Sequence, residues 1–131
     1  MANSAFEQIV EDFEFLEDWE DRYRYVIEEG KKMPELDDSL KVESNKVTGC
    51  ASQVWLHFSN SDKLYFDGDS DAIIVKGLIA LLRKLYNGTP INDIKNINAL
   101  ENLKKLGLDD HLSAQRSNGL KAMVERIQSL G

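Results

Sequence analysis

The sequence contains a single cysteine, Cys50, and the lack of a second thiol limits the chemistry open to the chain. One cysteine cannot form an internal disulfide, and it cannot supply the several thiolates that hold a structural zinc ion or an iron–sulfur cluster. A chain without disulfides is typical of a reducing compartment. We therefore expect a cytoplasmic protein with no resident metal.

Proline and glycine are also scarce, at 2 and 8 of 131 residues, and no low-complexity segment divides the chain. With 42% of its residues in the hydrophobic class, a chain of this length can bury roughly two-thirds of its unfolded surface in one core. We expect a single domain over residues 1–131.

Basic residues number 16 against 23 acidic ones, which gives a net charge of −7. Without a dense Lys/Arg cluster, binding to nucleic acid or to an anionic membrane is not expected. The most apolar segment, residues 72–85, is too short to span a bilayer. The first residues are acidic, unlike a secretory signal, so we expect them to belong to the mature protein. The acidic run from Glu7 to Asp21 favours a solvated face, although it can also steer docking onto a basic surface.

Hydrophobic residues recur at helical spacing toward both ends of the chain, and the middle changes to the alternation of a strand. Val54, Leu56 and Phe58 predict one strand, a turn follows at residues 60–62, and Leu64 with Phe66 predicts the return. A third strand is expected at residues 41–46. The predicted fold is α+β, with a small antiparallel sheet of about three strands packed against several helices. Helix starts are predicted at Ser4, Asp18, the 67–70 segment, Thr89, Asn98 and Ser113.

Cys50 follows a glycine in the segment between the two predicted strand regions, which places it on a loop at the sheet edge. A free cysteine is most often a small buried hydrophobic residue. The neighbours of Cys50 are small or polar, however, and loops are where reactive groups are displayed. Both interpretations stay open on this evidence.

Four motifs together resemble the SufE family of cysteine-desulfuration proteins, and they cover nearly the whole chain. They are Trp19-Glu20-Asp21-Arg22-Tyr23 with Gly30 to Pro34, Gly49-Cys50-x-Ser52-x-Val54-Trp55, Gly68-Asp69-Ser70-Asp71-Ala72-x-x-Val75-Lys76-Gly77-Leu78, and Leu112-Ser113-x-x-Arg116-Ser117-x-Gly119-Leu120. The proline that usually follows the Ser113 position is replaced by Ala114.

The resemblance implies an accessory sulfur-transfer protein that is not itself an enzyme and holds no cofactor. Members of this family take persulfide sulfur from a SufS-like cysteine desulfurase, which uses pyridoxal phosphate, and stimulate it. They carry the sulfur on the cysteine that matches Cys50 and pass it to a SufBCD-like iron–sulfur scaffold. A carrier benefits from having one thiol, because a second would release the sulfur by forming a disulfide.

The resemblance also draws attention to residues around Cys50. Gly49 and Ser52 are expected to shape the loop. Asp71 is expected first to cap a helix. Arg116 can pair with Asp71, either in transfer or only to hold the fold, or with the sulfur of Cys50. We further expect Cys50 to be buried in the free protein and exposed when the desulfurase docks.

Other functions are weighed against this one. His57 and His111 lack the spacing of metal ligands or of a Cys–His hydrolase, and they are expected to be structural. An assembly scaffold of the same general fold would need several cysteines. Two further alternatives remain, namely a carrier that serves another thio-biosynthetic acceptor, and an interaction module in which Cys50 is inert.

Overall fold

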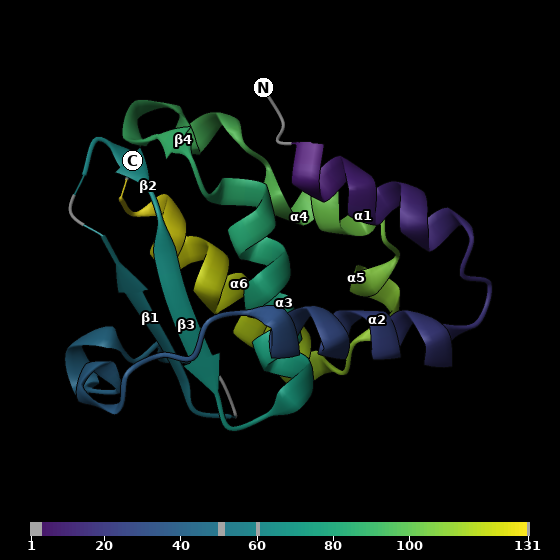
Figure 1. Cartoon of the computed structure of the whole chain (residues 1–131), viewed down its shortest axis with the longest axis horizontal. Coiled ribbons are helices and arrows are strands. Elements are labelled where there is room, and N and C mark those ends of the chain that lie inside the picture. Colours follow the sequence, from purple (N-terminus) through teal and green to yellow (C-terminus); the bar gives the residue numbers. More distant parts are fainter. Residues whose placement is uncertain (1–3, 50–51, 60, 131) are drawn as a thin grey trace.

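The computed structural model describes residues 4–49, 52–59 and 61–130, and places one long central helix between the strands and the N-terminal helices (Figure 1). The helices are α1 (Ser4–Glu14), α2 (Trp19–Lys32), α3 (Ile73–Tyr86), α4 (Ala99–Lys104), α5 (Leu108–His111) and α6 (Ala114–Gln128). The strands are β1 (Val54–Phe58), β2 (Lys63–Leu64), β3 (Phe66–Ser70) and β4 (Thr89–Pro90). Short 3-10 turns are η1 (Asp38–Leu40), η2 (Glu43–Asn45) and η3 (Ile91–Asn96).

The strands form two small antiparallel pairs. β1 pairs with β3 in a register that runs from Val54 opposite Ser70 to Phe58 opposite Phe66, and β2 pairs with β4. The α+β class and an antiparallel return to β1 are thus confirmed, but the return strand begins at Phe66, since Leu64 pairs with Thr89 of β4. The sheet is smaller than predicted, because β3 and its partner have no full third strand beside them in the described part of the chain.

The predicted strand at residues 41–46 is wrong, since this segment contains η2. Its backbone hydrogen bonds close turns instead of a ladder, with the Asn45 N–H donating to Val42 O at 3.0 Å and the Lys46 N–H to Glu43 O at 3.1 Å. A single bridge, from Lys46 to Trp55, is all that remains of the expected pairing. Local turn bonds at Ser44-Asn45 compete successfully with the ladder.

α3 forms the centre of the core because it is apolar on nearly every side. It packs against α2 on one side and against β3 on the other, and Ile79, Leu81 and Leu82 are fully buried. Gly77 lets α2 and α3 approach backbone to backbone, because a Cβ at this position would lie only 2.3 Å from Val26 O. This close crossing fixes α3, and with it the elements that flank the candidate site.

The predicted helix starts are confirmed at two of the later helices. Asn98 Oδ1 accepts the Glu101 N–H at 3.1 Å at the start of α4, and Ser113 Oγ accepts the Arg116 N–H at 3.3 Å at the start of α6. α5 was not predicted, and it follows Gly107, whose positive φ of 74° ends the preceding turn.

Two other predicted starts are wrong. β3 continues through Ser70, so the 67–70 segment does not cap α3, which begins at Ile73 after Ala72. Thr89 belongs to β4, and the residue that precedes the following helical turn is Pro90. In both cases pairing with a distant strand holds residues that locally favour a cap.

Within the described residues, no helix combines the length and the apolar character needed to cross a membrane.

Candidate functional site

The predicted reactive residue, Cys50, and its neighbour Ala51 lie outside the described residues, so the expected burial of Cys50 is not addressed by the structure. Both ends of the segment that carries them are described. We call residues 48–53 the Cys50 loop. Its base is closed where the Val47 N–H donates to Val54 O at 2.8 Å and where Lys46 bridges to Trp55. The loop therefore begins and ends at one fixed point beside β1.

Gly49 has the backbone conformation that the loop requires of a glycine. Its φ is +91°, a region that residues with a Cβ rarely adopt. A Cβ added here would lie 3.4 Å from the Cβ of Ala122 on α6, so the start of the loop passes close to that helix.

Ser52, at the other side of the loop, borders a hollow of about 330 Å³ between α3 and α6. Its buried lining is apolar, and its more exposed rim is polar. The apolar side chains are Val75, Leu78, Leu120 and Met123, and the rim residues include Ser52, Ser113, Gln115 and Arg116. Two of the predicted site residues, Ser52 and Arg116, thus lie on the rim of one hollow whose buried wall is apolar.

Arg116 is exposed on the first turn of α6. No described carboxylate forms an ion pair with it, so the suggested partnership with Asp71 is absent among these side chains. A cation at a helix N-terminus gains nothing from the helix dipole. The guanidinium is instead available at the rim of the hollow to a group with negative charge.

Asp71 has a different role from the expected helix cap. Its Oδ1 accepts the backbone N–H of Gln53 at 3.0 Å, and its own N–H donates to Gln53 O at 3.3 Å. These two bonds extend the β1–β3 pairing by one step beyond Ser70. Asp71 therefore holds the end of the Cys50 loop on the side of β3.

Asp69 links the segment before the loop to the rest of the fold. Its carboxylate pairs with Lys41 at 3.2 Å and with Lys76 at 3.6 Å, and it accepts the Ser70 N–H at 2.8 Å. Burial alone would raise the pKa of Asp69, but the hydrogen bonds from Ser70 and Lys41 outweigh it and lower the pKa. Lys41 also lies over the ring of Trp55, at 5.9 Å from its centroid.

Arg126, which no sequence motif indicates, contacts the other side of the loop base. From the last turn of α6 its guanidinium donates to the backbone oxygens of Ser44 and Lys46, at 2.7 Å and 3.1 Å. No local pattern points to this contact, because its partners lie 82 and 80 residues earlier in the chain.

The two histidines lie in separate settings. His57 faces Asp67 across the β1–β3 pair, and the ring of His111 stacks on Trp19 with centroids 3.7 Å apart. The Tyr23 hydroxyl donates to the backbone oxygen of His111. Within the described residues, no three His, Cys, Asp or Glu side chains gather in a way that could hold a metal ion.

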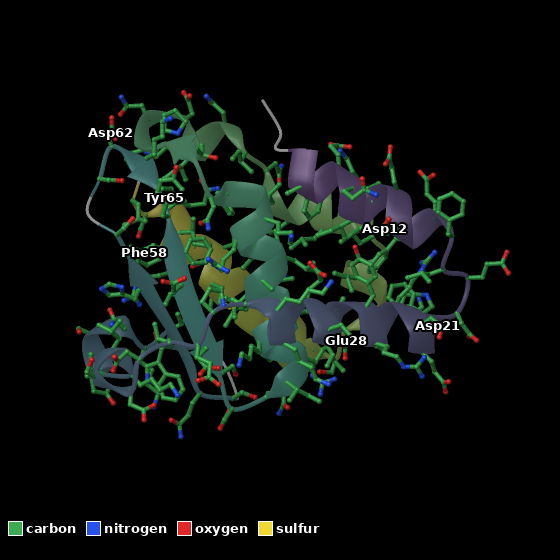
Figure 2. The ribbon with its side chains drawn as sticks, in the orientation of Figure 1. Asp12, Asp21, Glu28, Phe58, Asp62 and Tyr65 are labelled. Atoms are coloured by element: carbon green, nitrogen blue, oxygen red, sulfur yellow. The ribbon has the colours of Figure 1, made fainter. Side chains whose placement is uncertain are left out.

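The acidic residues near the N-terminus are remote from the loop base. Asp12 and Asp21, on α1 and α2, lie on the opposite side of the view from β1 and β3 (Figure 2). Any docking that these charges steer would involve a different part of the surface.

Comparisons with known proteins place this arrangement in a family. An uncharacterised SufE-like protein of Rhizobium etli is 52% identical over 130 residues, covering 95% of this chain and 88% of the relative. A second, from Rhizobium meliloti, is 48% identical over 131 residues, covering 96% and 94%. The fold resembles the solution structure of a hypothetical protein from Thermus thermophilus, with a TM-score of 0.77, 22% identity, and coverage of 99% and 95%.

The family model for the SufE domain, described as associated with Fe–S metabolism, matches residues 7–130. The match spans the Cys50 loop, the hollow and all of α6. The chain therefore belongs to the SufE family and takes part in Fe–S metabolism.

Proposed function

We propose that this chain accepts sulfur from a cysteine desulfurase onto Cys50, stimulates that enzyme, and delivers the sulfur to an iron–sulfur assembly scaffold. The observation that carries the proposal is the position of the two sides of the Cys50 loop. Gly49 lies near Ala122 of α6, and Ser52 borders the hollow between α3 and α6. A sulfur held between them would have both an apolar wall and a guanidinium within the same hollow.

The transfer is a thiol exchange that needs no oxidant. The Cys50 thiolate attacks the terminal sulfur of a persulfide on the desulfurase, a new S–S bond forms, and the old S–S bond breaks. The desulfurase cysteine leaves as a thiolate. The transferred sulfur keeps its own proton on Cys50 or releases that proton to water. Pyridoxal phosphate belongs to the desulfurase, where it supplies the chemistry that frees sulfur from cysteine. This chain supplies the acceptor thiol, Cys50.

The lining of the hollow suits this step. Apolar side chains such as Leu78 and Met123 line its buried side, and an apolar wall of this kind would shield a sulfur held against it from polar reagents. The guanidinium of Arg116 would favour the anionic form of a thiol or persulfide held in the hollow. With a single cysteine in the chain, the persulfide cannot collapse into an internal disulfide.

The test is mass spectrometry of this chain after incubation with cysteine and a SufS-like desulfurase, followed by mapping of the Cys50 peptide. We expect a mass gain of one or more sulfur atoms on that peptide, removed by a reducing agent. Cys50→Ser should fold normally and gain nothing, because a serine oxygen does not form the persulfide.

Two results would contradict the proposal. One is an unmodified Cys50 peptide beside an active desulfurase, which would favour an interaction module with an inert thiol. The other is full stimulation of the desulfurase by Cys50→Ser in the absence of any other thiol. Transfer of labelled sulfur to a SufBCD-like scaffold, compared with another thio-biosynthetic acceptor, then identifies the recipient.

A further inference from the structure

Arg126 joins the C-terminal helix to the base of the Cys50 loop. Its Nη2 donates to Ser44 O at 2.7 Å, and its Nη1 donates to Lys46 O at 3.1 Å. Among the described side chains, no carboxylate pairs with this arginine. The positive charge of the Arg126 side chain therefore binds two backbone oxygens of the short segment 44–46.

Those oxygens lie in and just after η2, a turn whose last carbonyls have no helical partner of their own. Basic side chains commonly satisfy carbonyls at such ends. A planar guanidinium can donate to two acceptors at once in a fixed geometry, which an ammonium group cannot do. Arg126 thus restrains both the position and the orientation of residues 44–46 against α6.

The contact lies directly at the loop base. Lys46 bridges to Trp55, and the next residue, Val47, donates to Val54 O at 2.8 Å. A displacement of Lys46 would therefore also move Val47 and Val54, the residues that flank the two ends of the loop.

Other residues on the same face of α6 also lie near the Cys50 loop. Ala122, one turn before Arg126, faces Gly49, and Arg116 shares the hollow with Ser52. The positions 116, 119, 122 and 126 are three or four residues apart, which is the spacing of one helix face. Ser44, Lys46 and Gly49 contact this face, and Arg126 is the one described side chain of α6 that forms hydrogen bonds with residues 44–46.

We propose that Arg126 is a positioning residue for sulfur transfer. It holds the base of the Cys50 loop at the position along α6 that the desulfurase requires. This inference rests on the proposed function. It assigns to the last turn of α6 a role in transfer that does not involve contact with the sulfur.

The experiment compares Arg126→Ala and Arg126→Lys with the wild-type chain in desulfurase stimulation, as a function of carrier concentration. We expect the maximal rate with Arg126→Ala to fall roughly tenfold to a hundredfold, because small misplacements remote from the reacting atoms have effects of this size. The concentration for half-maximal stimulation should stay close to that of wild type. Arg126→Lys should recover part of the rate, since an ammonium group keeps the charge and can donate to a backbone oxygen but lacks the rigid planar fork of the guanidinium.

Two controls separate positioning from loss of charge and loss of stability. Arg24→Ala removes an exposed arginine of α2 that pairs only with its neighbour Asp21 among the described side chains, and should leave the rate unchanged. Ile127→Val shortens a fully buried side chain next to Arg126, and should lower thermal stability without lowering the rate.

A second measurement does not depend on sulfur transfer. The rate at which iodoacetamide labels Cys50 in the isolated, folded protein should change several-fold in Arg126→Ala and remain at the wild-type value in Arg24→Ala. Wild-type stimulation and labelling by Arg126→Ala would overturn the inference. So would a loss of rate that appears only as a raised half-maximal concentration, since this would indicate direct contact with the partner. If the wild-type chain accepts no sulfur, the proposed function fails, and the labelling rates still decide whether Arg126 positions the loop.

Discussion

The carboxylate of Asp71 accepts the backbone N–H of Gln53 at 3.0 Å, three residues after Cys50 in the sequence. The return bond, from the Asp71 N–H to Gln53 O at 3.3 Å, makes the contact reciprocal. Asp71 and Arg126 thus hold opposite sides of the same loop base, one from the end of β3 and the other from α6. The loop base is fixed by residues remote in sequence, whose side chains bind backbone atoms.

Asp71→Ala should loosen the end of the loop, because it removes the acceptor for the Gln53 N–H. We expect the free energy of unfolding in urea to fall by about 1 kcal/mol, which is the usual contribution of one such bond. Labelling of Cys50 by iodoacetamide should change as well. Asp71→Asn keeps an oxygen at the same place and serves as the matched control. Equal labelling of all three proteins would show that this contact does not restrain the loop.

Asp69→Asn should lower stability in a pH-dependent way. The pKa of Asp69 in the folded protein lies below its usual value of 3.8, so its contribution to stability is present above that pH and is lost as the pH falls through the folded pKa. We expect Asp69→Asn to unfold more easily at pH 7, by about 1–3 kcal/mol, since Lys41 and Lys76 lose a charged partner. Below about pH 4 the difference from wild type should shrink.

Urea unfolding at pH 7 and at pH 3 measures this effect. Asp38→Asn is the control, because it removes the other, highly exposed carboxylate that pairs with Lys41. It should change the urea midpoint little at either pH. A constant difference between Asp69→Asn and wild type across this range would contradict the argument.

Gly77→Ala should disturb the crossing of α2 and α3. The added Cβ would lie 2.3 Å from Val26 O and 2.6 Å from a Val26 side-chain carbon, and neither helix can move without repacking the core. We expect a loss of about 3 kcal/mol in urea unfolding, at the upper end of the usual cost of overpacking. Glu125→Ala, at an exposed position of α6, should change stability by less than about 0.5 kcal/mol. A small effect of Gly77→Ala would mean that the two helices are not held in close contact.

Local signals in the sequence predict part of this fold correctly. The caps at Asn98 and Ser113 each depend on a side chain and an N–H three residues later, and both are present. The alternation around Val54 likewise predicts β1, because its inward side chains face a single core.

The wrong predictions concern segments whose conformation depends on contacts with residues outside the segment. Asp69 and Asp71 look like helix caps, but lysines from two other segments and the backbone of Gln53 bind them instead. The 41–46 segment has the residues of a weak strand, and it turns because its own short-range bonds, together with Arg126 80 residues away, satisfy its backbone. Neither set of contacts produces a periodic pattern in the sequence from which it could be predicted.

The same division applies to the candidate site. Family motifs identify Gly49, Ser52 and Arg116, and the structure shows that Ser52 and Arg116 share one hollow. Arg126 lies outside those motifs, since its function depends only on reaching two main-chain oxygens. Any residue type may occupy positions 44 and 46 without altering that contact, so the sequence there carries no record of it.

Cys50 should be protected in the free protein and become accessible when the desulfurase binds. The loop base is anchored on both sides, by Asp71 and by Arg126. If the thiol is enclosed, as we expect, attack by a small reagent requires a local opening of the loop. We expect iodoacetamide to label Cys50 more slowly in the folded protein than in urea, and more rapidly once a catalytically inactive desulfurase is added. Lysozyme at the same concentration controls for nonspecific effects of added protein. Rapid labelling of the free protein, unchanged by the desulfurase, would mean that the thiol is open at all times and that docking selects no particular state of the loop.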